Sequence, residues 1–151
     1  MTLERRRMGR ITVGVGTVVF RGESILLIKR GKAPFKGRWS IPGGRLEYDE
    51  ALEAAALREL REESGVEATI LGLIGVFEAL PSVALREEAG GNGHLVMVDY
   101  AAEWRSGEPV AGDDASAAEF FAIDEAMALV AWDETRRALR MAISRRLAGS
   151  G

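Results

Sequence analysis

Residues 44–66 read GRLEYDEALEAAALRELREESGV, and this stretch holds the strongest signal in the chain. Read as a helix, its second half places Glu59, Glu62 and Glu63 at i, i+3 and i+4, so three carboxylates share one face about one turn apart. Like charges at that spacing repel one another unless a cation lies among them. Carboxylate oxygens are the ligands that Mg²⁺ prefers, so the spacing predicts a divalent metal site.

The residues on either side of this helix support the same interpretation. Pro42, Gly43 and Gly44 form a turn just before it, and the glycines allow a backbone carbonyl or amide to approach an ion or a phosphate. Gly65 follows the last helical position, where a glycine commonly ends a helix. The unit is therefore predicted to be a loop, a helix and a stop.

The spacing resembles the signature of the Nudix hydrolases at every defined position. Gly44 is followed after five residues by Glu50, and after seven more by residues 58–66, RELREESGV. Residues 37–44, GRWSIPGG, also look like the approach loop of that family. The resemblance implies an α/β (α+β) fold, an α/β/α sandwich around a mixed β-sheet, in a single domain over residues 1–151.

The resemblance also implies roles for individual residues. Arg58 orients the glutamate that follows it, and the backbone carbonyl of Gly43 joins three carboxylates at the metal. Asp114, in the loop after residues 107–109, occupies a place where some members carry an extra acidic ligand or base. The implied metal ligands are Gly43, Glu59, Glu62 and Glu63. The identity of the catalytic base stays open among Glu59, Glu62 and Asp114.

These residues also have plainer interpretations. The glutamates can form an exposed acidic face balanced by Arg58 and Arg61, but the complete spacing and the flanking loop favour the metal site. Glu50 lies nine residues before Glu59, half a turn out of phase, so it can act only from the loop or the first turn. Asp49 stands where the family often has glycine, and it is expected to preserve the turn as a helix N-cap.

Two further side chains, together with Gly44, are candidates for substrate contacts. Arg30 offers a guanidinium fork that matches phosphate, and Trp39 offers an indole that can stack on a base. A buried Trp39 that anchors its loop is equally consistent with the sequence. His94 is expected to complete a strand, and it would carry protons only if it faced the pocket.

Composition limits the possible functions. The 151 residues carry a net charge of −3 and 47% hydrophobic residues, which is enough for one core and unfavourable for binding nucleic acid polymers. The absence of cysteine and the single histidine argue against disulfides, thiolate chemistry and zinc sites. No signal peptide or membrane span is visible, so we expect a cytoplasmic protein with residues 1–10 as a flexible basic tail. A homodimer is expected, because many relatives are dimers and the first strand and tail can pair across a two-fold axis.

Hydrophobic patterning predicts the remaining elements. Strands are expected over residues 11–20, 25–30, 68–78, 94–104 and 119–123, and the first two should form a hairpin. Helices are expected over residues 49–64 and 133–147. Gly72 or Gly75 is expected to break the third strand. A mobile surface loop is expected over residues 81–93, and a long turn over residues 105–116.

Together these features predict a metal-dependent pyrophosphohydrolase that uses Mg²⁺ or Mn²⁺ and takes a small-molecule nucleotide. The layout looks like small bacterial members of the family that act on ADP-ribose, which would yield AMP and ribose 5-phosphate. One alternative is a nucleoside triphosphate pyrophosphohydrolase of the sanitising type. The others are a non-catalytic nucleotide-binding regulator and a cation-binding structural module on the same fold.

Overall fold

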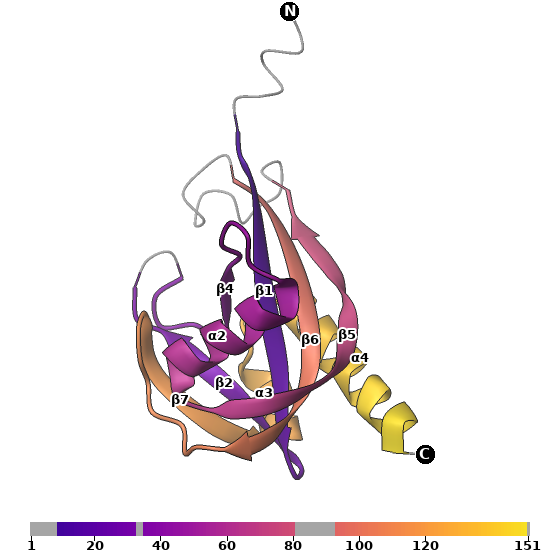
Figure 1. Cartoon of the computed structure of the whole chain (residues 1–151). Helices are drawn as coiled ribbons and strands as arrows, with labels where there is room; N and C mark the ends of the chain where they lie inside the picture. Colours follow the sequence, from indigo (N-terminus) through magenta and orange to yellow (C-terminus); the bar gives the residue numbers. More distant parts are fainter. Residues whose placement is uncertain (1–8, 33–34, 81–92, 151) are drawn as a thin grey trace, which may run out of the picture.

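A computed structural model describes residues 9–32, 35–80 and 93–150, and shows a sheet with helices on both faces (Figure 1). The strands are β1 (Ile11–Arg21), β2 (Ser24–Arg30), β3 (Trp39–Ser40), β4 (Gly43–Arg45), β5 (Glu67–Ala79), β6 (His94–Ser106) and β7 (Ala115–Ala122). The helices within the described residues are α2 (Leu52–Ser64), α3 (Ile123–Leu129) and α4 (Asp133–Ser150). The main strand order is β3-β2-β1-β6-β5, with β4 paired to β1 and β7 paired to β2. Since β1 and β6 are parallel and the other pairs antiparallel, the predicted mixed α/β fold is confirmed.

The alternating side chains of β1 separate α2 from α4. Val19 packs in one core cluster with Leu60 of α2, whereas Val18 packs in another with Leu139 of α4. Neighbouring residues of a strand point to opposite faces of a sheet. The two helices therefore cover opposite faces, and the face under α2 carries the predicted metal site.

The helix of the Nudix-like stretch is shorter at its start than predicted. It begins at Leu52, and Ala51 precedes it without a side-chain capping hydrogen bond. Asp49 has a φ of 60°, in the left-handed region that glycine occupies readily and aspartate tolerates. The prediction of Asp49 as the N-cap is therefore wrong, because this residue forms the turn before the helix. At the other end, Gly65 has a φ of 71° and ends the helix as predicted.

Several elements depend on pairing that the sequence pattern does not show. β4 was expected to be a turn, yet it pairs with β1, and a Cβ on Gly43 would overlap the carbonyl oxygen of Val15. β7 is longer than predicted because it pairs with β2 along almost the whole length of that strand. α3 was not predicted at all. The predicted hairpin of β1 and β2 is confirmed, and β5 shifts register at both Gly72 and Gly75.

Two predicted features lie wholly or largely outside the described residues. These are the basic tail, of which residues 1–8 are not described, and the loop, of which residues 81–92 are not described. Within the described part of the chain, no helix combines the length and the apolar character that crossing a bilayer requires.

Candidate active site

Three carboxylates meet beside the C-terminal half of α2. Glu59, Glu62 and Asp113 each place one carboxylate oxygen within 4.8 Å of the others. The first two lie one turn apart on α2, and Asp113 comes from the loop that precedes β7. A hard divalent cation prefers several oxygen ligands at close range, so this donor set fits Mg²⁺ or Mn²⁺. We call these three residues the carboxylate cluster.

Arg58 donates five hydrogen bonds, two of which hold carboxylates of the cluster. Its Nε and Nη2 donate to the two carboxylate oxygens of Glu50 at 2.7 and 2.9 Å. Its Nη1 donates to Glu59 and to Glu62, each at 2.8 Å, and Nη2 also donates to the carbonyl oxygen of Arg45 at 3.0 Å. Glu50 lies just before the first residue of α2. Its two hydrogen bonds with Arg58 fix the orientation of the guanidinium group.

Burial and charge set the ionisation of these acids. Burial raises the pKa of Glu59, although the hydrogen bond from Arg58 opposes the change. Burial also raises the pKa of Glu63, to about 8, against the hydrogen bond from Gly43 and the charge of Arg30. By contrast, the hydrogen bonds from Arg58 lower the pKa of Glu50. A cation beside Glu59 and Glu63 would therefore favour their charged forms.

Glu63 has a partner other than the carboxylate cluster. Its Oε1 accepts a hydrogen bond from the backbone N–H of Gly43 at 2.7 Å, and the residue is buried. The two predicted metal ligands at Gly43 and Glu63 are thus joined to each other, and their role as ligands stays a prediction. In this arrangement Glu63 connects β4 to α2.

The position of the Glu59 carboxylate requires a residue without a side chain at position 44. A Cβ on Gly44 would overlap the carboxylate of Glu59, while the Gly44 backbone pairs with Val15 of β1. Any larger residue would force either the strand or the carboxylate to move. The glycine at the start of the stretch therefore makes room for a carboxylate of the cluster.

The loop before β7 is attached to the end of α2. Val110 N–H donates to the carbonyl oxygen of Ser64 at 2.9 Å, and Gly112 N–H donates to that of Glu63 at 3.0 Å. These bonds satisfy carbonyl groups in the last turn, which have no partner inside the helix. These two bonds therefore fix the loop against the last turn of α2.

This attachment brings Asp113, and not Asp114, to the carboxylate cluster. Asp113 has a φ of 51°, and its carboxylate lies with those of Glu59 and Glu62. Asp114 instead pairs with Lys32 at 3.0 Å. The loop acid at the cluster is thus Asp113, one residue before the predicted Asp114, and it is Asp113 that has the left-handed backbone. The sequence signal is the pair of aspartates after Gly112, which does not show which one faces α2.

The remaining candidates have different surroundings. Arg30, at the end of β2, is close enough to Glu63 for its charge to lower the pKa of that carboxyl group. Trp39 packs edge-on against Phe121 with 5.0 Å between ring centroids, which matches the interpretation of a tryptophan that anchors its loop. His94 begins β6 and its Nε2 lies 3.1 Å from a carboxylate oxygen of Glu78, outside the carboxylate cluster.

Comparisons with known proteins point to one family. The profile of the NUDIX domain matches residues 10–142. An ADP-ribose pyrophosphatase of Methanocaldococcus jannaschii is 37% identical over 109 residues, which are 72% of this chain and 60% of that protein. An 8-oxo-dGDP phosphatase of Danio rerio is 37% identical over 83 residues, which are 52% of this chain and 26% of that protein.

Solved structures show the same fold. A MutT NUDIX hydrolase from Burkholderia pseudomallei is 33% identical, with a TM-score of 0.69 over 87% of this chain and 98% of that one. A NUDIX hydrolase from Nitrosomonas europaea is 25% identical, with a TM-score of 0.73 over 91% of this chain and 73% of that one. The signature residues, the fold and the matched profile lead to one conclusion: the chain belongs to the Nudix family.

Proposed function

We propose that this chain is a metal-dependent pyrophosphohydrolase that cleaves a nucleoside diphosphate linked to another moiety, with ADP-ribose as the substrate. The observation that carries the proposal is the convergence of Glu59, Glu62 and Asp113 on one point beside α2. The name of the relative from Methanocaldococcus jannaschii supports the choice of substrate. Water and ADP-ribose would yield AMP and ribose 5-phosphate.

Individual residues of the site would have separate roles in this reaction. Glu59, Glu62 and Asp113 would hold the metal, which when bound neutralises charge on the phosphate oxygens and activates water. Arg58 keeps two of these carboxylates in place, and Arg30, whose charge lowers the pKa of Glu63, would bind a phosphate. Water attacks one phosphorus of the diphosphate, the P–O bond of the anhydride breaks, and a carboxylate of the cluster accepts the proton.

A substrate panel tests the proposal. ADP-ribose, NADH, dinucleoside polyphosphates and nucleoside triphosphates are incubated with the protein and Mg²⁺ or Mn²⁺, and products are separated by chromatography. We expect AMP and ribose 5-phosphate from ADP-ribose in a reaction that EDTA abolishes. Release of pyrophosphate from a triphosphate at the higher kcat/KM would favour the alternative, which the name of the Danio rerio relative supports. No turnover of any substrate would favour a nucleotide-binding regulator.

Substitutions in the cluster connect this activity to the geometry. Glu62→Gln is expected to lower kcat by at least about 100-fold, because it removes one negative ligand. Glu53→Gln is the matched control, since Glu53 is an exposed glutamate in the first turn of the same helix. A near-normal rate of Glu62→Gln at saturating Mg²⁺ would contradict the proposed metal site.

A homodimer is part of the same proposal. Ile11, at the start of β1, is 70% exposed, so the first strand has an apolar side chain available for a partner. Light scattering at micromolar concentration is expected to give twice the chain mass of 16.3 kDa. A monomeric mass would overturn the dimer without affecting the proposed reaction.

A further inference from the structure

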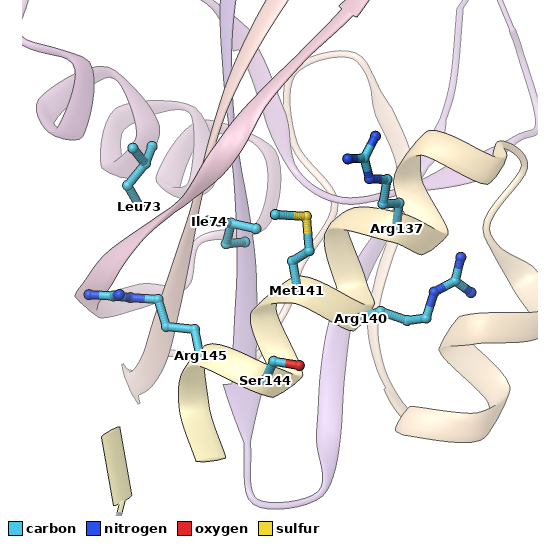
Figure 2. A pocket seen from close by; sticks show the side chains of 7 residues that line it. All are labelled: Leu73, Ile74, Arg137, Arg140, Met141, Ser144 and Arg145. Atoms are coloured by element: carbon cyan, nitrogen blue, oxygen red, sulfur yellow. The ribbon is translucent and has the colours of Figure 1, made fainter. Parts of the chain in front are cut away.

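A second charged surface lies away from the carboxylate cluster, between the edge strand β5 and helix α4. A groove of about 400 Å³ opens there, lined by apolar side chains from both elements and by arginines of α4 (Figure 2). The lining residues are Leu73, Ile74, Arg137, Arg140, Met141 and Arg145, together with Ser144. Because α4 and α2 cover opposite faces of the sheet, this groove is separate from the proposed active site.

Two other arginines of α4 have structural partners. Arg136 donates to the carbonyl oxygens of Met127 and Val130 at 2.9 and 2.7 Å, in the last part of α3 and just beyond it. Arg146 pairs with Glu103 at 2.7 Å. Both side chains thus hold α4 to the rest of the fold.

Within the described ranges of the chain, the three arginines of the groove have no such acidic partner. Among the residues that the structure describes, Arg137, Arg140 and Arg145 form no ion pair. Arg137 lies 5.9 Å from the ring of Phe77, which does not neutralise its charge. In a chain with a net charge of −3, three positive charges without an acidic partner mark a local site for an anion.

The side chain of Arg145 lies against the backbone of the edge strand β5 at Gly72. A Cβ on Gly72 would overlap the guanidinium of Arg145, and its Nη2 donates to the carbonyl oxygen of Leu71 at 3.3 Å. The glycine therefore allows this side chain to lie across β5. One end of the groove carries a positive charge at a defined position.

The charges are distributed along the groove and do not converge on one point. Figure 2 shows Arg137 and Arg140 on one side of Met141, and Arg145 on the other side, toward β5. Eight helical positions separate Arg137 from Arg145, or about 12 Å along the axis. Figure 2 shows Ile74 beside Met141 between the charged ends, whereas Leu73 projects from the other side of β5. A single phosphate would reach only one end, so the groove suits an extended partner.

We propose that this groove binds an extended acidic polypeptide segment that carries an apolar side chain between its acidic residues. Carboxylates of the segment would pair with the guanidiniums, and the apolar side chain would cover Met141 beside Ile74. β5 pairs only with β6 among the described strands, so a peptide can lie along its open edge. A polyphosphate chain would match the charges but leave the apolar floor exposed.

An NMR titration of the ¹⁵N-labelled full chain tests this site. The probe is a twelve-residue peptide in which every second residue is a glutamate or a leucine in turn, with serines between them, so that glutamates and leucines share one face of the extended chain. The same peptide with glycine in place of leucine is compared with it. We expect amide shifts at Leu73, Met141 and Ser144 with the leucine peptide, and weaker binding of the glycine peptide. Glu59 and Glu62 should not shift, which distinguishes the groove from the active site.

Two double variants distinguish peptide binding in the groove from a general effect of positive charge on the protein. Arg137→Gln combined with Arg140→Gln is expected to weaken peptide binding about tenfold, since two exposed ion pairs are lost. Arg10→Gln combined with Arg105→Gln removes two exposed charges elsewhere and should change binding less than twofold. The hydrolysis rate should stay the same in both pairs.

Four results would overturn the proposal. The first two are the absence of amide shifts in the groove at millimolar peptide and equal binding of the peptide by the two double variants. The third is tighter binding of inorganic polyphosphate than of the leucine peptide at the same amides. The fourth is a dimer, detected by light scattering, that the Arg137→Gln, Arg140→Gln variant abolishes. The last result would assign the groove to a second copy of this chain.

Discussion

The carboxylate of Glu63 accepts a hydrogen bond from the backbone N–H of Gly43 at 2.7 Å, which joins the last turn of α2 to β4. Burial raises the pKa of this carboxyl group to about 8, which favours its neutral form in the absence of a cation. The residue can therefore act as a neutral anchor without metal and as a charged ligand with it.

Glu63→Gln distinguishes these two roles. Glutamine keeps an oxygen that can accept the hydrogen bond from Gly43 and has no charge, so thermal stability should be unchanged or higher. If Glu63 becomes a metal ligand, kcat should fall by at least about 100-fold. A normal kcat with normal stability would limit Glu63 to anchoring β4.

Gly44→Ala should disturb the active site more than the fold. The added Cβ would displace the carboxylate of Glu59, so metal affinity and kcat should each fall at least about tenfold. Gly93→Ala is the control, because a Cβ there would meet no other atom within 4 Å. Equal activity of the two variants would show that Glu59 can move without loss.

The two loop aspartates should behave differently. Asp113→Asn is expected to lower kcat about 10- to 100-fold with little change in KM, because Asp113 lies in the carboxylate cluster. Asp114→Asn should be mild, because it loses only an exposed pair with Lys32. Steady-state kinetics of both variants measure the two effects. A greater loss of kcat in Asp114→Asn than in Asp113→Asn would show that the loop changes its position when substrate binds.

Arg58→Lys should be severe although it keeps the charge. Lysine cannot bond to Glu50 at two points while also reaching Glu59 and Glu62, so kcat should fall at least about tenfold and the melting temperature should drop. Arg61→Lys is the control on the same helix, since Arg61 pairs with exposed Glu67 at 2.8 Å. Similar rates in both variants would show that charge alone is sufficient at residue 58.

Asp99 should make stability depend on pH. This buried residue lies between Gly16 and Gly75 in the sheet, its Oδ1 has no hydrogen-bond partner among described residues, and burial raises its pKa from 3.8 to about 7. The folded state thus favours the protonated acid. Its contribution to stability is complete below pH 4 and is lost as the pH rises to 7.

Asp99→Asn removes this titration. The variant should melt at a higher temperature than the wild type at pH 8, and the difference should shrink toward pH 5. Each unit of pKa corresponds to about 1.4 kcal/mol, so the expected gain at pH 8 is a few kcal/mol at most. Calorimetry at several pH values measures it, and an equal effect at pH 5 and pH 8 would exclude the titration of Asp99 as the cause.

Several features of the fold and of the site were predictable because they depend on local geometry. The helix repeat places Glu59 and Glu62 on one face wherever the helix lies, and Gly65 ends that helix through its own φ. Alternating apolar residues likewise predict the long strands and the hairpin. These properties need only a few neighbouring residues, so the amino-acid sequence by itself determined them.

Other features depend on which distant segments meet. Asp113 reaches the carboxylate cluster only because Gly112 bonds to the last turn of α2, and Trp39 contacts Phe121 only because β3 and β7 both pair with β2. Glycine-rich β4 has low strand propensity and forms a strand through its pairing with β1. The tertiary structure alone decided these points, because backbone pairing and packing between distant segments set the position of each side chain, and local spacing carries no record of them.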